Sequence, residues 1–214
     1  MSKGELPAHQ PRSRQTREKI VNALGDALKE KPFDQVSVAE IAERAGVAVG
    51  SVYQRFKNKD ALIPVILEIY KKRIAEWTQG DGRIEIEDTD DLRSALRKLM
   101  RQSWKIVTRE AHLLRAVHLN ARFRPELGAG EEWAKYEKAS VEGVKSLLMH
   151  YEQQIKRKNM NRAVTYAAYF FNAIMIEKGL YPEESPARLC KHRGNAFPDD
   201  CADMLYGFLT TPEE

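Results

Sequence analysis

The chain has 214 residues, of which 43% are hydrophobic, and its formal net charge at pH 7 is +4. This composition is sufficient for a hydrophobic core in one domain or two. Its two cysteines are too few for a disulfide framework, no apolar run approaches the length of a membrane span, and no signal-peptide core precedes Ile20. We therefore expect a cytoplasmic protein with reduced thiols and no membrane association.

The excess positive charge is unevenly distributed along the chain. Residues 1–77 contain 14 Lys and Arg against 10 Asp and Glu, whereas residues 78–214 contain 21 of each. A local excess of positive charge favours binding to a polyanion such as nucleic acid. The N-terminal segment is therefore where we expect a nucleic-acid interface.

The first residues carry glycine and prolines but no apolar periodicity. We expect residues 1–12 to form a disordered arm, followed by a helix over residues 14–30 whose apolar stripe includes Ile20 and Leu24. Pro32 ends this helix because it disfavours helical backbone at the preceding residue. The basic residues at the helix start are either solvated or part of an arm that touches DNA.

A helix–turn–helix pattern follows between Ser37 and Leu62. Ser37 and Glu40 have the spacing of a capping box, and Gly46 stands where a left-handed residue that ends a helix is expected. The pattern predicts one short helix before Gly46 and a second over residues 48–56. Helices this short are marginal alone and need a further helix to pack against.

The second helix has an inward and an exposed face. Val52 and Phe56, spaced i, i+4, face inward. On the exposed face, small residues allow close approach to base edges, and hydroxyl, amide and cationic groups suit phosphates and bases. The predicted DNA-contacting residues are Ser37, Ala48, Val49, Gly50, Ser51, Tyr53, Gln54, Arg55 and Lys59. The alternative is a small three-helix packing unit with a solvated basic edge.

This stretch contains a series of short motifs, namely Ala45-Gly46-Val47, Gly50-Ser51-Val52-Tyr53, Phe56 and Asn58-Lys59-Asp60-Ala61-Leu62. They resemble the signature of the TetR (tetracycline-repressor) family of bacterial regulators, over residues up to about 75. One departure is Ala48, where the family usually has a small polar residue. Ala48 can neither cap the helix nor donate to a phosphate.

The resemblance implies an all-α fold in two parts. The N-terminal helix–turn–helix unit, residues 13–77, ends in a linking helix over residues 59–77. The C-terminal part, residues 78–214, is expected to bind a ligand and to dimerise. In the resembled family a ligand-driven swing of the linking helix alters the spacing of the DNA-reading helices. Residues 78–91, with two glycines and a run of acids, are the clearest linker.

The C-terminal part is predicted to be helical throughout. Its segments are 92–107, 110–123, 131–155, 162–178 and 199–209, with Asp88 to Asp91 and Asn159 or Asn161 as candidate N-caps. Residues 162–178 are apolar nearly all round, which indicates burial on most sides, by a partner chain or in the core of a monomer. The resemblance implies a homodimer through the last two helices. The predicted interface residues are Val164, Ala168, Phe171, Met175, Leu205 and Leu209.

The resemblance also implies a pocket for a small-molecule inducer, which the side chains available suggest is apolar or aromatic. The predicted lining residues are Trp104, Phe123, Trp133, Tyr136, Tyr166 and Phe170; each can equally be plain core. No catalytic motif is present, so we expect neither an enzyme nor a cofactor. Cys190, His192 and Cys201 match no zinc spacing, so no metal is expected.

The predicted function is a homodimeric transcriptional regulator, in the simplest case a repressor released from a palindromic double-stranded DNA operator by its inducer. Two alternatives stay open. One is a DNA-binding protein of the same fold without a ligand switch, such as an architectural or division-linked protein. The other is a helical protein–protein adaptor that has lost DNA binding.

Overall fold

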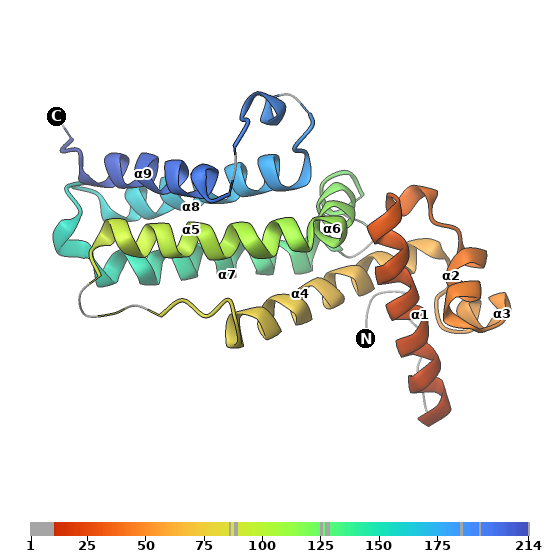
Figure 1. Cartoon of the computed structure of the whole chain (residues 1–214). Coiled ribbons are helices and arrows are strands. Elements are labelled where there is room, and N and C mark those ends of the chain that lie inside the picture. Colours follow the sequence, from red (N-terminus) through yellow and green to blue (C-terminus); the bar gives the residue numbers. More distant parts are fainter. Residues whose placement is uncertain are drawn as a thin grey trace. The chain divides into compact units, whose positions relative to one another are not determined.

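Every regular element in this computed structural model is a helix, which confirms the all-α prediction (Figure 1). The residues that the structure describes contain no β-strand. Among these residues, no helix has both the length and the hydropathy that crossing a bilayer requires. The structure describes residues 11–85, 87, 90–124, 126, 129–184, 186–192 and 194–213, and for residues 11, 12, 129 and 130 the backbone alone.

The chain divides into two compact units. The first comprises Met1–Ala75 and Glu110–Lys135, and the second comprises Glu76–Arg109 and Tyr136–Glu214. The first boundary lies close to the expected one at residue 77. That residues 110–135 group with the N-terminal unit was not expected from the sequence, and the separate functions assigned to the two parts stay predictions.

The first unit contains the helix–turn–helix stretch and the elements that support it. Its elements are α1 (Pro11–Glu30), η1 (Phe33–Gln35), α2 (Val38–Ala45), α3 (Val49–Tyr53), η2 (Lys59–Leu62), most of α4 (Ile63–Gln79), α6 (Ala111–Phe123) and the start of α7 (Ala129–His150).

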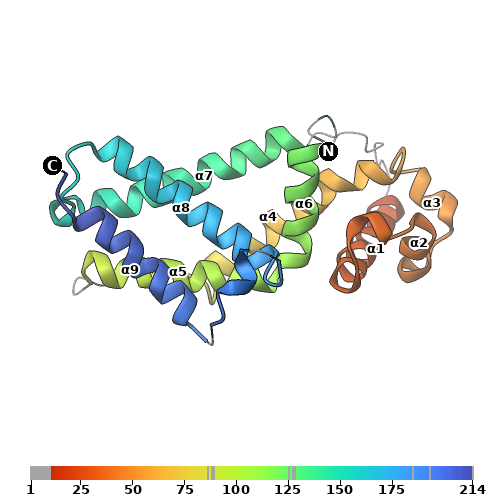
Figure 2. The same ribbon diagram turned by 90° about the horizontal axis from the view of Figure 1, so that it is seen from above.

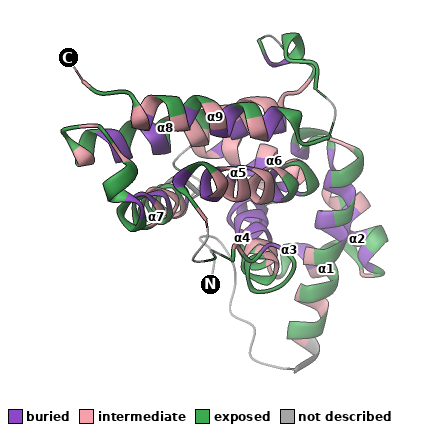
Figure 3. Cartoon of the chain, turned by 60° about the vertical axis from the view of Figure 1, so that its left-hand side comes forward, coloured by how far each residue is buried: buried purple, intermediate pink, exposed green. Residues whose placement is uncertain are grey.

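The core of the first unit is built on one face of α1. Ile20, Leu24 and Ala27 are fully buried at helical spacing. Phe33 and Val36, from the turn before α2, are also buried. Figure 3 shows the resulting division, with buried inner faces and exposed outer faces on α1 and α2. The short helices therefore have the packing partner that their length requires.

Helix α6 is joined to the helix–turn–helix unit by ion pairs. Arg124 contacts Asp60 of η2 with 2.5 Å between Nη2 and Oδ2. Arg73 of α4 contacts the buried carboxylate of Glu110, at the N-terminal end of α6, with 2.5 Å between Nη1 and Oε2. The partners are far apart in the sequence, which is why a local pattern did not assign α6 to this unit.

The second unit is a bundle in which α5 lies against both α8 and α9 (Figure 1 and Figure 2). Gly179 allows α8 to approach α5 closely, because a Cβ there would collide with the side chain of Val107. The elements of this unit are α5 (Leu92–Arg109), the rest of α7, η4 (Glu152–Gln154), α8 (Met160–Leu180), η5 (Ala187–Leu189) and α9 (Ala196–Thr210).

Charged pairs join α5 to α9 along their length. Arg93 and Arg97 both contact Asp203, with 2.9 Å and 2.8 Å between Nη2 and Oδ2. Arg101 contacts Asp199, with 2.6 Å between Nε and Oδ1. The arginines hold the pKa of both carboxyls below the ordinary value. Since the residues on each helix are spaced i, i+4, the pairs fix the register between the two helices.

Several predicted element boundaries are corrected by the structure. Residues 1–10 of the expected arm lie outside the described residues, whereas Pro11 and Arg12 are helical. Helix α9 begins at Ala196 because Pro198 falls in its first turn, where a missing N–H costs nothing. Other corrections are the end of α3 at Tyr53, the split of the linking helix into η2 and α4, and the bounds of α7. Asp91 and Asn159 are the observed N-caps of α5 and α8.

Candidate nucleic-acid interface

Helix α2 begins and ends as its sequence predicts. The Ser37 hydroxyl accepts a hydrogen bond from the backbone N–H of Glu40 at 3.1 Å. Gly46 ends the helix in the left-handed region with φ of 63°. The Glu40 carboxylate contacts Lys31 and Arg44 at 2.6 Å and 3.0 Å, so its described contacts are ion pairs and not the second half of a capping box. Lys31 and Arg44 hold its pKa below the ordinary value.

Helix α3 is short and is held by two buried side chains. Val52 and Phe56 are each 1% exposed. Ala48 occupies the N-cap with extended backbone (φ −68°, ψ 147°) and provides no side-chain cap. The helix is therefore fixed by its packing and not by its own capping, and its remaining side chains face outward.

The predicted DNA-contacting residues of α3 form its outer surface. Val49 and Tyr53 are 41% and 49% exposed, which is high for large apolar and aromatic side chains. A Cβ added at Gly50 would meet no atom within 4 Å, so packing inside the chain does not explain the glycine. Ala48 and Gln54 are also exposed, and Ser51 is half-buried.

Arg55 is tied to the first turn of α1. Its Nε donates to the Ser13 carbonyl at 3.3 Å, and its Nη2 donates to the Ser13 hydroxyl at 3.2 Å. Its Nη1 donates to the Ser51 carbonyl at 3.1 Å. Three donors of the guanidinium are thus engaged within the chain, which gives Arg55 a positioning role that the sequence did not indicate. Its contact with a base stays a prediction.

Lys59 lies at the start of η2 and contacts the turn before α2. Its Nζ donates to the Asp34 carbonyl at 2.9 Å and lies 4.8 Å from the centre of the Phe33 ring. An ammonium has three donors, so this contact leaves capacity for a phosphate. Asn58 caps η2 by accepting from the N–H of Ala61 at 3.0 Å. Sequence analysis gave Asn58 no such role, although Asn is a preferred N-cap.

The predicted ligand-lining residues differ in their unit and in their exposure, and their role as a pocket lining stays a prediction. Phe123 and Trp133 belong to the first unit, where Phe123 is 72% exposed and Trp133 is buried. Tyr166 is 54% exposed on α8, and Tyr136 and Phe170 are half-buried. Trp104 lines a cleft of the second unit. The differing exposure follows from each residue's place on its helix face, which aromatic character alone does not reveal.

The predicted interface residues lie mostly inside the second unit itself. Their exposed fractions are 6% or less, apart from half-buried Phe171; they are Val164, Ala168, Met175, Leu205 and Leu209. The exposed large side chains of the last two long helices are instead Tyr166, Tyr169 and Met204, at 54%, 74% and 61%. The dimer interface through α8 and α9 stays a prediction, and these three exposed side chains are additional candidates for it.

Comparison with known proteins bears on the helix–turn–helix stretch. A family model described as bacterial regulatory proteins, tetR family, matches residues 20–66, which span the buried face of α1, both short helices and the start of α4. Residues 20–66 therefore match the TetR family. The expectation from the short motifs is confirmed over the segment that carries them.

The chain is similar to two TetR-type regulators of Bacillus subtilis. An uncharacterized HTH-type transcriptional regulator, YvdT, is 43% identical over 51 residues, 24% of this chain and 26% of the relative. A fatty acid metabolism regulator protein is 32% identical over 80 residues, 37% of this chain and 38% of the relative. The chain thus matches less than half the length of these relatives. Both are named as regulators and not as enzymes.

The likeness in fold extends over most of the chain. The structure of the transcriptional regulator FadR from Bacillus subtilis in complex with stearoyl-CoA superimposes with a TM-score of 0.64 at 19% identity. The match covers 89% of this chain and 97% of FadR. At this identity the likeness establishes the TetR-type fold for both units and nothing further.

Proposed function

We propose that this protein is a homodimeric DNA-binding regulator of transcription of the TetR family, most simply a repressor, with the outer surface of α3 as its reading head. The observation that carries the proposal is Gly50. Gly50 lies in the exposed first turn of α3, and nothing in the chain occupies the space beside it. A molecule that approaches the backbone from outside, such as a DNA base edge, accounts for the glycine.

The surrounding side chains have chemistry suited to the two kinds of DNA contact. Val49 and Gln54 flank Gly50 on the exposed surface and are positioned to meet base edges. Ser51, Tyr53 and Lys59 carry hydroxyl and ammonium groups that suit phosphates. Because Ala48 can neither cap the helix nor donate a hydrogen bond, one copy makes few contacts with DNA. This favours a dimer that binds the two half-sites of a palindrome.

Dimerisation is proposed through the exposed faces of α8 and α9. Tyr166 and Tyr169 on α8 and Met204 on α9 are large side chains in an otherwise well-buried bundle. The rings of Tyr166 and Phe208 lie 6.3 Å apart, so the two exposed stripes adjoin. We expect Tyr169→Glu to halve the mass measured by light scattering at micromolar concentration. A monomeric mass for the unaltered protein contradicts the dimer.

Release by a small-molecule inducer is the remaining part of the proposal. The complex of FadR with stearoyl-CoA supports a ligand-responsive role for this fold, at the level of analogy. An inducer that binds more tightly to the conformation with low DNA affinity weakens DNA binding. The loss is limited by the difference between the inducer's affinities for the two conformations. An architectural protein of the same fold would instead bind many sites and be released by no small molecule.

The test of the proposal is selection of bound duplexes from a random DNA library, followed by anisotropy with the selected duplex. We expect a palindromic consensus, and a loss of affinity of at least tenfold in a Tyr53→Ala, Lys59→Ala double variant. Lys158→Ala, at an exposed site of the second unit that takes part in no proposed contact, is the control for loss of a surface lysine. Equal affinity in the unaltered protein and the double variant refutes the DNA-binding assignment and favours the adaptor.

A further inference from the structure

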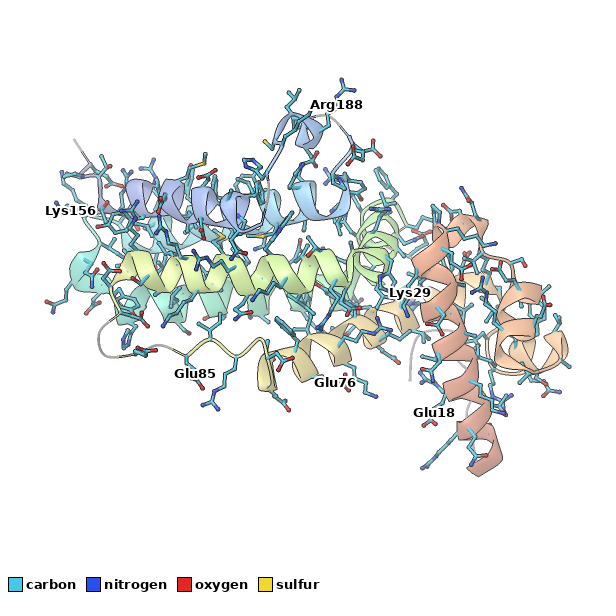
Figure 4. The ribbon with its side chains drawn as sticks, in the orientation of Figure 1. Glu18, Lys29, Glu76, Glu85, Lys156 and Arg188 are labelled. Carbon is cyan, nitrogen blue, oxygen red and sulfur yellow. The ribbon has the colours of Figure 1, made fainter. Side chains whose placement is uncertain are left out.

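The second unit contains an open cleft between Trp104 of α5, the C-terminal end of α8 and the segment that leads into α9. Its volume is about 530 Å³, within the range of small-molecule sites. Figure 4 labels Arg188 on the segment between α8 and α9, where it stands away from the bundle. The segment folds back through Lys178, whose Nζ donates to the Ala187 carbonyl at 2.7 Å. One wall of the cleft is thus formed by helices, and the other by a loop that the hydrogen bond from Lys178 anchors.

Aromatic rings form the floor of this cleft. The rings of Trp104 and Phe197 lie 4.8 Å apart and are tilted by 51°. The centre of the His192 ring lies 5.4 Å from that of Phe197. Phe197 is buried, whereas Trp104 is half-buried and lines the cleft. Rings arranged in this way offer an apolar, polarisable surface on which a further planar ring stacks.

Cations surround the aromatic floor. Lys178, Arg188 and Lys191 all line the cleft, against one acidic lining residue, Glu183. Arg188 and Lys191 are exposed, so their charges face solvent at the opening. On the side of α9, the Asp200 carboxylate lies 3.9 Å from Nδ1 of His192. The excess of positive charge among the lining residues favours an anion, because a concave low-dielectric wall strengthens attraction to it.

We propose that this cleft binds an organic anion that carries a planar ring, with the ring on Trp104 and the carboxylate or phosphate on Arg188 and Lys191. The inference rests on the proposed function, because it assigns this cleft as the binding site of the regulatory ligand. None of the other five residues predicted to line a pocket belongs to it. Arg188 and Lys191 come from a loop between α8 and α9, and the sequence pattern does not reveal that this loop lies beside α5.

The first experiment is calorimetric titration with 2-naphthoate and with 2-naphthamide, which share a ring and differ in charge. We expect the naphthoate to bind roughly tenfold more tightly, as hydrogen bonds to charged groups allow. The combined Arg188→Gln, Lys191→Gln variant should remove this difference. Lys158→Gln, which removes a charge from an exposed site outside the cleft lining, should preserve it. Equal affinities of the two compounds for the unaltered protein overturn the proposal.

AMP, titrated in parallel, distinguishes the source of the negative charge. Tighter binding of AMP identifies a phosphate as the preferred anion, and tighter binding of 2-naphthoate identifies a carboxylate. Either result supports the proposal if Trp104→Ala weakens binding by at least several-fold, because stacking on the floor then contributes. Failure of both anions to bind at millimolar concentration overturns it.

Cys190 gives an independent readout, because it lines the cleft and is exposed. The other cysteine, Cys201, is buried, and burial raises its pKa to about 11, so it reacts slowly. We expect the anionic aromatic disulfide dithiobis-nitrobenzoate to label Cys190 faster than the neutral dithiodipyridine does, relative to free cysteine. Added 2-naphthoate should slow the labelling. No protection by 2-naphthoate at saturating concentration contradicts the placement of the ligand.

These measurements are made without DNA. A negative result in them can therefore be distinguished from a failure of the proposed DNA-binding function. If both anions fail to bind while the selected duplex still binds, the cleft assignment is wrong and the DNA-binding role stands. If 2-naphthoate binds the cleft but leaves DNA affinity unchanged, its assignment as the regulatory site is wrong.

Discussion

Helix α5 of the second unit and the surface beside α3 of the first use their cations in different ways. On α5, Arg93, Arg97 and Arg101 face the aspartates of α9 and are neutralised by them. Beside α3, Lys57 is exposed to solvent, and Lys59 contacts only a carbonyl and a ring among its described partners. The arginines of α5 thus fix the register of two helices, whereas Lys57 and Lys59 leave positive charge at the surface beside α3.

This difference shows why pairing matters more than the number of charged residues. The C-terminal part is rich in arginine and lysine yet balanced, with 21 basic and 21 acidic residues from residue 78 onward. An arginine already bonded to a carboxylate gains little from a phosphate, because the two anions compete for the same donors. This contrast requires that buried side chains hold α3 in place beneath its exposed surface. Substitutions on the two sides can test this requirement.

The largest effect is expected at the buried side of α3. Phe56→Ala should lower the free energy of unfolding by about 3 to 5 kcal/mol, since Phe56 is 1% exposed and its removal leaves a cavity. Tyr53→Ala, three residues away and 49% exposed, should change it by about 0.5 kcal/mol or less. Urea unfolding followed by circular dichroism measures both. Similar losses for the two variants would break the division of α3 into a buried and a binding side.

The next effect concerns the unequal caps of the two short helices. Ser37→Ala should cost about 1 kcal/mol of stability, because the Glu40 N–H loses its acceptor. Ala48→Ser should gain about 0.5 to 1 kcal/mol, because Ala48 has the extended backbone of an N-cap but no oxygen. Thermal unfolding of both variants tests the pair. No gain from serine at residue 48 would mean that α3 is fixed wholly by its packing.

The smallest effect is expected at the paired charges of the second unit. Asp203→Asn should lower stability at pH 7 by about 0.5 to 1 kcal/mol, because its partners are partly exposed and water screens them. The arginines hold the pKa of Asp203 below its ordinary value of 3.8. The contribution is therefore complete well above the ordinary pKa, and it is lost as the pH falls through that value toward the lower native pKa.

Urea unfolding at pH 7 and at pH 3 measures this dependence. The gap in stability between the unaltered protein and Asp203→Asn should be wider at pH 7 than at pH 3, where the carboxyl of the unfolded chain is largely protonated while the native carboxyl is still ionised. Arg83→Gln, at an exposed site whose Nε lies 3.9 Å from the Glu85 carboxylate, should show no such change with pH. A gap that is constant from pH 7 to pH 3 would show that the aspartate acts through packing and not through charge.

Sequence predicted most where the determining contacts are local. The cap at Ser37, the left-handed Gly46 and the buried spacing of Val52 and Phe56 depend on residues within four positions of one another. For the same reason Asp91 was correctly among the candidate caps.

The sequence was least informative where the contacts are long-range. The tie between Arg55 and Ser13 joins residues 42 positions apart, and that between Arg124 and Asp60 joins residues 64 apart. Periodicity marks residues of α8 as apolar but does not say which side faces α5. Met175 was therefore placed at an interface although it is 2% exposed within its own unit.

The central claim is that the surface beside α3 binds DNA while the paired charges of α5 do not. The most direct test is the affinity for the selected duplex at several salt concentrations, for Lys57→Gln and Arg93→Gln, which remove one positive charge each. We predict that Lys57→Gln weakens binding roughly fivefold and lowers the salt slope by about one per subunit, as expected for a phosphate contact. Arg93→Gln should leave both unchanged. Equal effects of the two substitutions, or an unchanged slope in Lys57→Gln, would contradict the account.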